Sequence, residues 1–513
     1  MENSQSSRTI SSIRNAAYGL LNQLVILVLG FVSRTVFLHF LNETYLGINS
    51  LFSEILSMLS LADLGLATVM AYTFYKPLAE NDGDKINALL AFYKNVYRLI
   101  AAAVSVVGLL LLPFLGMIVN TAQPVKGLRI YYLLFLSKTV ISYLFVYKTT
   151  ILTADQKGYL VSNVSTITKI ATVACQITAI IITKNFVVYL LVEIFFTWFN
   201  NYLCAKRADR LYHPSVPAMA LAAREKKEIF LNIKAGFIYK LSSVLLNSTD
   251  NTLISVLLST ELVGLYSNYG MVFSRLSMFV NIFFSSLAAS VGNLIVLSDK
   301  KNTYRVFSTI QIIGFSISTI TSVCCFVLMS DFVKLWIGEK YVFGMDVLIA
   351  CVLNYYFSIA LQPLWIYRDA TGLYKKTKYV MLCTAAVNLA LSIALGRVTG
   401  LAGIIFASVI ARLATYFWYE PCILFKSSFD KKAYHFFLQH AYNFGVTAVL
   451  CFAGTAFFSK AVIVENFLDF IVKAMAVVAF SLLGVLAANV WRKDFRQAMH
   501  FLGSRCKMVL HKG

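Results

Sequence analysis

Stretches of about twenty apolar residues recur along the whole of this 513-residue chain. Each is long enough for a helix to cross the roughly 30 Å of hydrocarbon in a bilayer. Hydrophobic residues make up 59% of the sequence and charged residues only 13%, whereas about a quarter of the residues in soluble domains are charged. We therefore predict an all-α integral membrane protein with about fourteen transmembrane helices.

The predicted spans are residues 15–40, 46–75, 95–119, 128–150, 159–183, 186–205, 229–258, 262–291, 306–329, 342–367, 379–396, 400–425, 434–459 and 466–490. Pro363 lies in the middle of the tenth span, where it removes a backbone donor. We expect a kink at this point.

Lysine and arginine are distributed unevenly between the loops on the two sides of these spans. An even number of spans puts both termini on one side, and most of the basic residues outside the spans fall on that side, in segments such as 206–227, 300–305 and 368–378. Because cytoplasmic loops carry the excess of Lys and Arg, we predict that both termini are cytoplasmic. This asymmetry accounts for the net charge of +21, and no nucleic-acid-binding motif accompanies it. Nucleic acid is not expected as a partner.

Cysteine and histidine show no pattern typical of a metal site. The nine cysteines occur singly or as the pair Cys324-Cys325, without a CxxC motif. His435 and His440 are five positions apart, which is not the spacing of a helical zinc pair. The glycine-rich phosphate-binding loop of ATPases is also missing from the sequence. We expect no metal and no cofactor, and a retained N-terminus without a cleaved signal peptide.

A weak internal repeat relates two parts of the chain. Residues 45–53 resemble residues 262–270, with Gly47 aligned on Gly264. Six spans separate the copies, so that both have the same orientation in the membrane. This pattern predicts two parallel six-helix lobes around a central cavity, related by an axis along the membrane normal.

The repeat also predicts the domain boundaries. Residues 1–210 form an N-terminal lobe of six spans, 211–228 a cytoplasmic linker, 229–428 a C-terminal lobe of six spans, and 429–513 two further spans with a basic cytoplasmic tail. Two similar lobes that face each other across a cavity are typical of alternating-access transporters. We therefore predict a transporter and not an enzyme, the alternative being a duplicated membrane scaffold.

Several segments of the first hundred residues resemble bacterial polysaccharide flippases. They are Leu29-Gly-Phe-Val-Ser-Arg-Thr-Val-Phe37, Tyr45-Leu-Gly-Ile-Asn49, Leu56-Ser-Met-Leu-Ser-Leu-Ala-Asp-Leu-Gly65 and Tyr75-Lys-Pro-Leu-Ala79. These flippases are the O-antigen and capsule-type oligosaccharide-lipid translocases of the multidrug/oligosaccharidyl-lipid/polysaccharide (MOP) exporter superfamily.

The resemblance implies a V-shaped bundle in the bacterial inner membrane. Its cargo would be an undecaprenyl-diphosphate-linked oligosaccharide, moved from the cytoplasmic to the outer leaflet for lipopolysaccharide or capsule synthesis. Membrane lipids and polysaccharide assembly proteins are the other partners that it implies. In related lipid II flippases a groove at the last two helices holds the lipid tail, and Arg34 resembles an arginine that they place in the cavity.

Ionisable side chains inside the spans are candidate functional residues, because a charge near the bilayer centre costs at least about 2.5 kcal/mol. The basic candidates for binding an anionic head group in the cavity are Arg34, Lys240, Arg275, Lys138, Lys169 and Arg412. Guanidinium and ammonium groups suit a diphosphate and suit a cationic drug poorly. The acidic candidates for coupling to a proton or sodium ion are Asp63, Glu54 and Asp250. Alternatively, basic and acidic residues of the spans pair with one another and only hold helices together.

We therefore predict a flippase for a polyprenyl-diphosphate-linked oligosaccharide that works by alternating access. Two other functions remain open. A multidrug/cation antiporter of the same superfamily would need acidic residues to dominate the cavity. A membrane polysaccharide polymerase would normally need a large outer loop with catalytic arginines or histidines, but the predicted outer loops at 120–127 and 330–341 are short and lack histidine.

Overall fold

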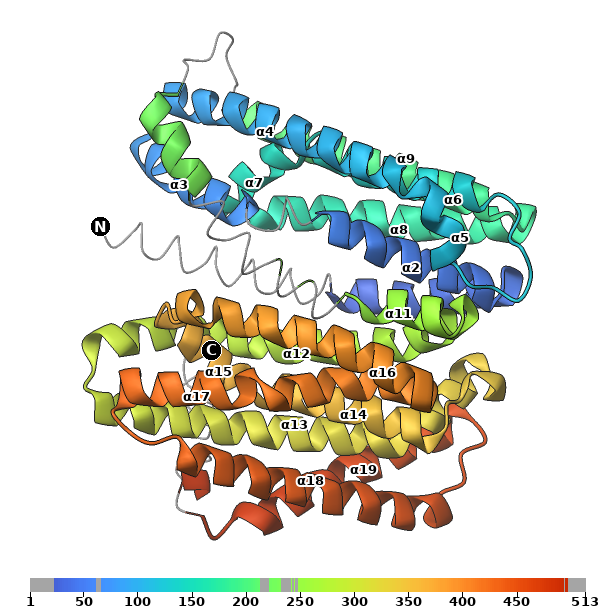
Figure 1. Cartoon of the computed structure of the whole chain (residues 1–513), viewed down its shortest axis with the longest axis vertical. Coiled ribbons are helices and arrows are strands. Elements are labelled where there is room, and N and C mark those ends of the chain that lie inside the picture. The colour runs from blue at the N-terminus through green and yellow to red at the C-terminus, as the bar shows by residue number, and fades with distance from the viewer. Residues whose placement is uncertain are drawn as a thin grey trace. The chain divides into compact units, whose positions relative to one another are not determined.

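The computed structural model describes residues 23–60, 66–212, 221–231, 248–492 and 494–496, together with Leu241 and Val244. These residues form helices joined by short loops, and no β-strand occurs among them (Figure 1). The predicted all-α fold is confirmed. Two of the predicted site residues, Asp63 and Lys240, lie outside the described residues.

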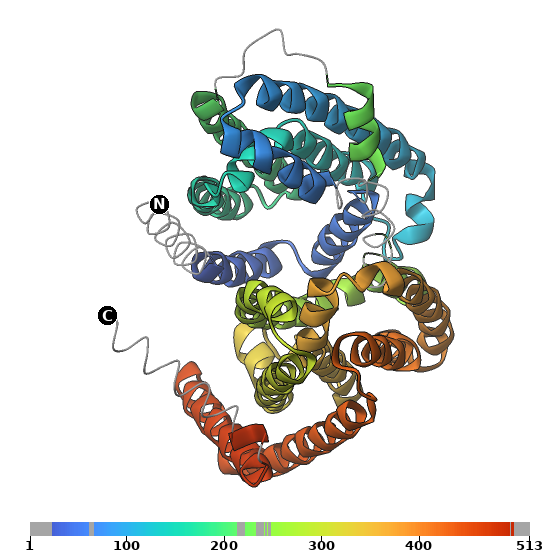
Figure 2. The ribbon, with the colours of Figure 1, turned by 90° about the vertical axis from the view of Figure 1, so that its left-hand side faces the viewer.

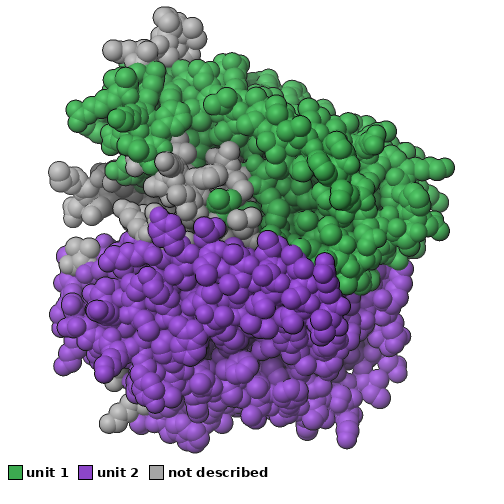
Figure 3. Space-filling view, in the orientation of Figure 1, with its two compact units in different colours: residues 1–267 green, residues 268–513 purple. Residues whose placement is uncertain are grey.

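The chain divides into two compact units, residues 1–267 and 268–513 (Figure 3). Unit 1 contains a first helix whose apolar part is Gln23–Phe40. It is followed by α2 (Glu43–Leu59), α3 (Leu66–Glu80), α4 (Gly83–Leu110), the 3-10 helix η2 (Leu112–Phe114), α5 (Leu115–Ile118), α6 (Leu128–Tyr143), α7 (Val146–Ala154), α8 (Gly158–Thr183), α9 (Phe186–Tyr212) and α11 (Asp250–Leu257). The next helix, α12 (Thr260–Leu297), begins in unit 1 and continues into unit 2.

Unit 2 continues with α13 (Lys300–Ile337), η3 (Glu339–Tyr341), α14 (Met345–Ala360), α15 (Gln362–Ala370), α16 (Tyr374–Ala414), α17 (Tyr416–Leu424), the π-helical turn η4 (Phe425–Phe429), α18 (Tyr434–Ala461) and α19 (Phe467–Asn489). Helices α18 and α19 form a hairpin at one edge of this unit (Figure 2). The predicted lobe boundaries themselves stay a prediction.

Ten of the described helical segments are long and apolar enough to cross a membrane, or eleven if the bent pair α6 and α7 counts as one span. The predicted count of fourteen is not confirmed. Parts of the predicted spans 46–75 and 229–258 lie outside the described residues. The predicted spans 379–396 and 400–425 fall within one helical segment, Tyr379–Phe429, which is interrupted by a kink at Gly400.

That long segment is a hairpin in space. A straight helix of 41 residues, the length of α16, would measure about 60 Å, twice the thickness of the hydrocarbon. Instead, Gly400 adopts φ 64° and ψ −138°, a conformation that glycine reaches without strain. Beyond it, Asn388 Nδ2 donates to Ser408 Oγ at 2.9 Å, so that the arms before and after Gly400 lie side by side.

Pro363 interrupts the predicted tenth span, as expected. Helix α14 ends at Ala360 and α15 begins at Gln362, with the proline in its first turn. The break frees backbone carbonyls inside the membrane, where each must find a donor. Gln311 of α13 fulfils this need, because its Nε2 donates to Ala360 O at 3.1 Å.

Each unit has its own core. In unit 1, the ring of Phe186 contacts the rings of residues from the first helix, α2 and α6, namely Phe37, Tyr45, Tyr131 and Phe135. In unit 2, 67% of the apolar window of α13 is buried, against 22% in α18 and in α19. Helix α13 is therefore central, and the last two helices present most of their apolar surface outwards.

A buried ion pair joins two helices of unit 2. Arg368 Nη1 of α15 lies 2.9 Å from Glu420 Oε1 of α17, and both side chains are buried. The sequence predicts Arg368 in a cytoplasmic loop and does not indicate Glu420 as a candidate, whereas the structure buries both side chains against each other. A buried pair contributes little net stability, but removing one partner leaves the other charge without compensation.

We expect the Glu420→Ala variant to be destabilised by about 3–5 kcal/mol, because Arg368 stays buried without its main partner. Thermal unfolding of the purified protein in detergent measures this loss. The double variant Arg368→Met/Glu420→Leu removes both charges and should be closer to the parent protein. A Glu420→Ala protein as stable as the parent would contradict the role of the pair.

Candidate functional site

Lys138 of α6 forms an ion pair inside the membrane region. Its Nζ lies 2.8 Å from Glu193 Oε1 of α9, and the two side chains are 29% and 21% exposed. The ammonium also lies over the ring of Phe135, 5.6 Å from its centroid. This contact fits the alternative in which charged residues of the spans hold helices together.

Arg34 lies in the first helix and reaches α12. Its Nη1 donates to Ser267 Oγ at 3.0 Å. Among the described residues it has no ion-pair partner, so its positive charge is hydrogen-bonded but not neutralised. Unlike the charge of Lys138, which the carboxylate of Glu193 neutralises, the charge of Arg34 is available to an anionic ligand.

Two arginines of unit 2 also lack an acidic partner in the described part of the chain. Arg412, on the second arm of the α16 hairpin, is 8% exposed, and its Nη1 donates only to the backbone carbonyl of Asn354 on α14, at 3.4 Å. Arg275 lies on α12 and is half-buried. In both residues the Nε is buried and makes no hydrogen bond. A guanidinium left unpaired at membrane depth is costly and marks a candidate functional site.

Lys169 differs from these arginines in its exposure. It lies on α8 with an exposed side chain. A long lysine side chain on an outward face can extend along the helix towards the membrane surface. Its predicted part in a cavity site stays a prediction, as does that of Lys240.

Two of the predicted ion-coupling residues come together. Glu54 of α2 accepts a hydrogen bond from the backbone N–H of Asn251 at 3.3 Å, and Asp250, the first residue of α11, directly precedes Asn251. Two neighbouring carboxylates repel each other unless a proton or cation is shared between them. The residues are far apart in sequence, so that the spacing of charges along the chain could not predict this pair.

Sequence reasoning missed a buried histidine in unit 2. His440 of α18 is 3% exposed and packs against the rings of Phe315, Phe417 and Phe436. Neither ring nitrogen has a hydrogen-bond partner in the described structure. Its position inside the apolar span 434–459 was the available signal. No group of three His, Cys, Asp or Glu side chains within the described ranges is arranged to hold a metal ion.

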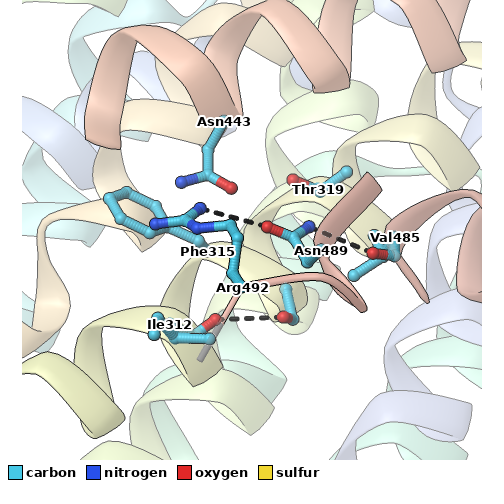
Figure 4. A pocket seen from close by; sticks show the side chains of 8 residues that line it. Ile312, Phe315, Thr319, Asn443, Val485, Asn489 and Arg492 are labelled. Atoms are coloured by element: carbon cyan, nitrogen blue, oxygen red, sulfur yellow. Dashed lines mark hydrogen bonds between the residues drawn. The ribbon is translucent and has the colours of Figure 1, made fainter. Parts of the chain in front are cut away.

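A narrow polar pocket lies between α13, α18 and α19 (Figure 4). Arg492, which follows α19, is part of its lining, and its Nη1 donates to Asn489 Oδ1 at 3.1 Å. The pocket is lined by Ile312, Phe315, Ser316, Thr319, Asn443, Val485, Asn489 and Arg492. It is at the hairpin of the last two helices, for which the resemblance implies a lipid-tail groove, and that role stays a prediction.

No family model and no curated protein sequence matches this chain. Solved structures do match. The lipid II flippase MurJ, in an inward closed conformation, aligns with a TM-score of 0.67 and 14% identity over 93% of this chain and 98% of its own. A multidrug-resistance MATE transporter of the MOP superfamily, inward-facing, aligns with a TM-score of 0.56 and 12% identity, over 80% of this chain and 99% of its own.

The MATE multidrug transporter DinF-BH aligns with a TM-score of 0.53 and 14% identity, over 81% of this chain and 96% of its own. At such low identities the likeness establishes the fold. The chain therefore has the fold of MOP-superfamily transporters, and the resemblance predicted from its sequence is confirmed at that level.

Variants of the Lys138–Glu193 pair can distinguish a structural role of Lys138 from a role in ligand binding. If the pair only joins α6 to α9, Lys138→Met should destabilise the protein by about 1–3 kcal/mol, and Lys138→Met/Glu193→Gln should recover part of the loss. Unfolding midpoints in detergent measure both. A Lys138→Met protein of unchanged stability would contradict this structural role, and Lys138 would remain a candidate for an anion-binding site.

Proposed function

We propose that this chain, with its MOP-type fold, is a flippase that moves a polyprenyl-diphosphate-linked oligosaccharide from the cytoplasmic to the outer leaflet by alternating access. The observation that carries the proposal is the uncompensated positive charge of Arg34, Arg275 and Arg412. None of these arginines has an acidic partner in the described part of the chain.

The contrast with the other membrane-embedded basic residues supports an anionic cargo. Lys138, Arg368 and Lys473 each lie within 3 Å of a carboxylate, that of Glu193, Glu420 or Asp331. Such pairs explain why those charges are tolerated in the membrane. The unpaired arginines have no such explanation, whereas a diphosphate would supply both the missing charge and acceptors for their N–H groups.

The fold alone does not choose between the two transporter functions, because the matching structures include a lipid II flippase and multidrug transporters. Electrostatics favours the flippase, since a cationic drug gains nothing from unpaired guanidinium groups. An enzyme that polymerises polysaccharide is less well supported. The predicted outer loops between α5 and α6 and between α13 and α14 remain short, and a catalytic residue pair is not evident in them.

We propose further that Glu54 and Asp250 carry the coupling proton or cation. They lie on α2 and α11, and the first turn of α11 already donates a backbone hydrogen bond to Glu54. A proton or monovalent cation between the two carboxylates would relieve their repulsion. Asp63, the third candidate, stays a prediction.

Deleting the gene in its host should cause complete lipid-linked repeat units to accumulate on the cytoplasmic leaflet, because the step that moves them outwards is lost. Leaflet-specific enzymatic labelling of the glycan measures their position. Single units that already face outwards would contradict the flippase and indicate a polymerase. Normal glycan together with new sensitivity to cationic drugs would indicate the multidrug function.

Replacing Arg275 or Arg412 by alanine should lower the flipping rate about tenfold or more, since a charge-assisted contact of about 1.5–3 kcal/mol is lost. The amount of protein in the membrane should stay the same. Arg397→Ala is the matched control, because its side chain is exposed on α16, and it should flip at the parental rate. If protein abundance falls in parallel with flipping, these arginines are structural.

Glu54→Gln keeps the acceptor for the Asn251 N–H but removes one negative charge. Flipping by this variant should no longer respond to an imposed proton or sodium gradient, measured in vesicles that contain labelled lipid-linked glycan. Glu193→Gln, whose carboxylate is held by Lys138, should still respond. A Glu54→Gln protein with parental gradient dependence would exclude the pair as the coupling site.

A further inference from the structure

A cavity of about 590 Å³ lies in unit 2, between the start of α13, the start of α18 and the residues that follow α19. Its lining includes Lys301 and Arg305 of α13, Lys431 and His435 at the start of α18, and Asp494 after α19. Each of these three parts of the chain lies at the predicted cytoplasmic end of its span. The structure thus brings them together at one end of the helices.

The lining of this cavity carries more positive than negative charge. Lys301, Arg305 and Lys431 have no ion-pair partner among the described residues. The ammonium group of Lys431 lies over the ring of Tyr304, which also lines the cavity, 4.1 Å from its centroid. Of the two lining carboxylates, that of Asp299 is already engaged, because it caps the start of α13. The site therefore suits a ligand with a negatively charged group.

A second cavity, of about 470 Å³, continues from the first. The two cavities share His435 and Asp494. The second is bordered by the exposed side chains of Leu438, Tyr442 and Trp491. Tryptophan and tyrosine are enriched at the depth of the lipid head groups. The charged cavity is thus predicted to lie at head-group depth, and the second cavity leads from it to the exposed apolar face of α18.

The residues after α19 are held against the helices and form one wall of this site. Phe495 is buried in an apolar cluster with Ile312 of α13 and Val485 of α19. The guanidinium group of Arg492 lies over the ring of Tyr442, 5.2 Å from its centroid, and adds a positive charge to the second cavity. A head group would therefore meet a wall that the fold has already positioned.

We propose that these two cavities bind an anionic glycerophospholipid of the cytoplasmic leaflet. Its phosphate binds Lys301, Arg305 and Lys431 in the first cavity, and an acyl chain leaves through the second along α18. Basic pockets between transmembrane helices on the cytoplasmic side are typical sites for such head groups. A free phosphate ion would gain nothing from the second cavity, which favours the amphiphile. The bound lipid joins α13, α18 and the residues after α19, and so stabilises unit 2 whatever the cargo is.

The first test measures the unfolding midpoint of the purified chain in detergent with added phosphatidylglycerol. This lipid should raise the midpoint by several degrees, because it binds the folded protein. Phosphatidylcholine with the same acyl chains has no net charge and should raise it much less. Arg305→Ala/Lys431→Ala should lose most of the shift specific to phosphatidylglycerol. Lys432→Ala is the matched control and should keep it, because Lys432 is exposed and lines neither cavity.

Quenching of Trp491 fluorescence provides a second test that does not depend on stability. Phosphatidylglycerol with brominated acyl chains should quench the emission that Trp491→Phe removes, more strongly than brominated phosphatidylcholine does. Arg305→Ala/Lys431→Ala should abolish this excess. If either difference between the two lipids is absent, the proposal is overturned. A midpoint shift of the same size with inorganic phosphate would assign the cavity to a free anion and would also overturn the lipid. Neither measurement involves cargo, so that a failure of the proposed function would leave both results unchanged.

Discussion

Charged and hydrogen-bonding groups inside a membrane must be satisfied by the protein itself, and this requirement organises the whole structure. At the helix break near Pro363, Gln311 donates a hydrogen bond to the free carbonyl of Ala360. At Gly400 the chain turns back, and Asn388 donates a hydrogen bond to Ser408. Lys138, Lys473 and Arg368 are each placed beside a carboxylate. Against this background an unsatisfied group stands out, because hydrocarbon offers it no alternative partner.

Among the described residues, Arg275, Arg412 and His440 have buried side-chain nitrogens that make no hydrogen bond, and none of these three side chains is in an ion pair. Arginine cannot lose its charge to escape this penalty, since its guanidinium stays protonated at any physiological pH. An unpaired Arg412 or Arg275 is therefore a lasting positive potential within the helices of unit 2. His440 behaves differently, because a neutral imidazole among aromatic rings carries no net charge and can remain buried. Of these groups, only the arginines carry a fixed charge that attracts an anion.

The sequence predicts those features of the fold that depend on local pattern. Apolar stretches of membrane length predict the helical membrane fold, Pro363 predicts a break, and the aligned glycines predict a repeat. The pairing of charges could not be predicted, because Lys138 and Glu193, or Glu54 and Asp250, meet only through tertiary packing. Arg368 shows the same limit, since position in the sequence suggested a loop whereas the fold buries it beside Glu420.

The reciprocal contact of Gly47 with the Thr260 backbone and of Gly264 with that of Glu43 is an isologous interface of the kind found in symmetric homodimers. In a symmetric homodimer both chains would use the same surface for this contact, so that a single glycine position in the sequence would serve both sides. In this single chain the same contact needs glycine at two separate positions. A change at either position now breaks the symmetry of the contact, so that each half limits how far the other can diverge.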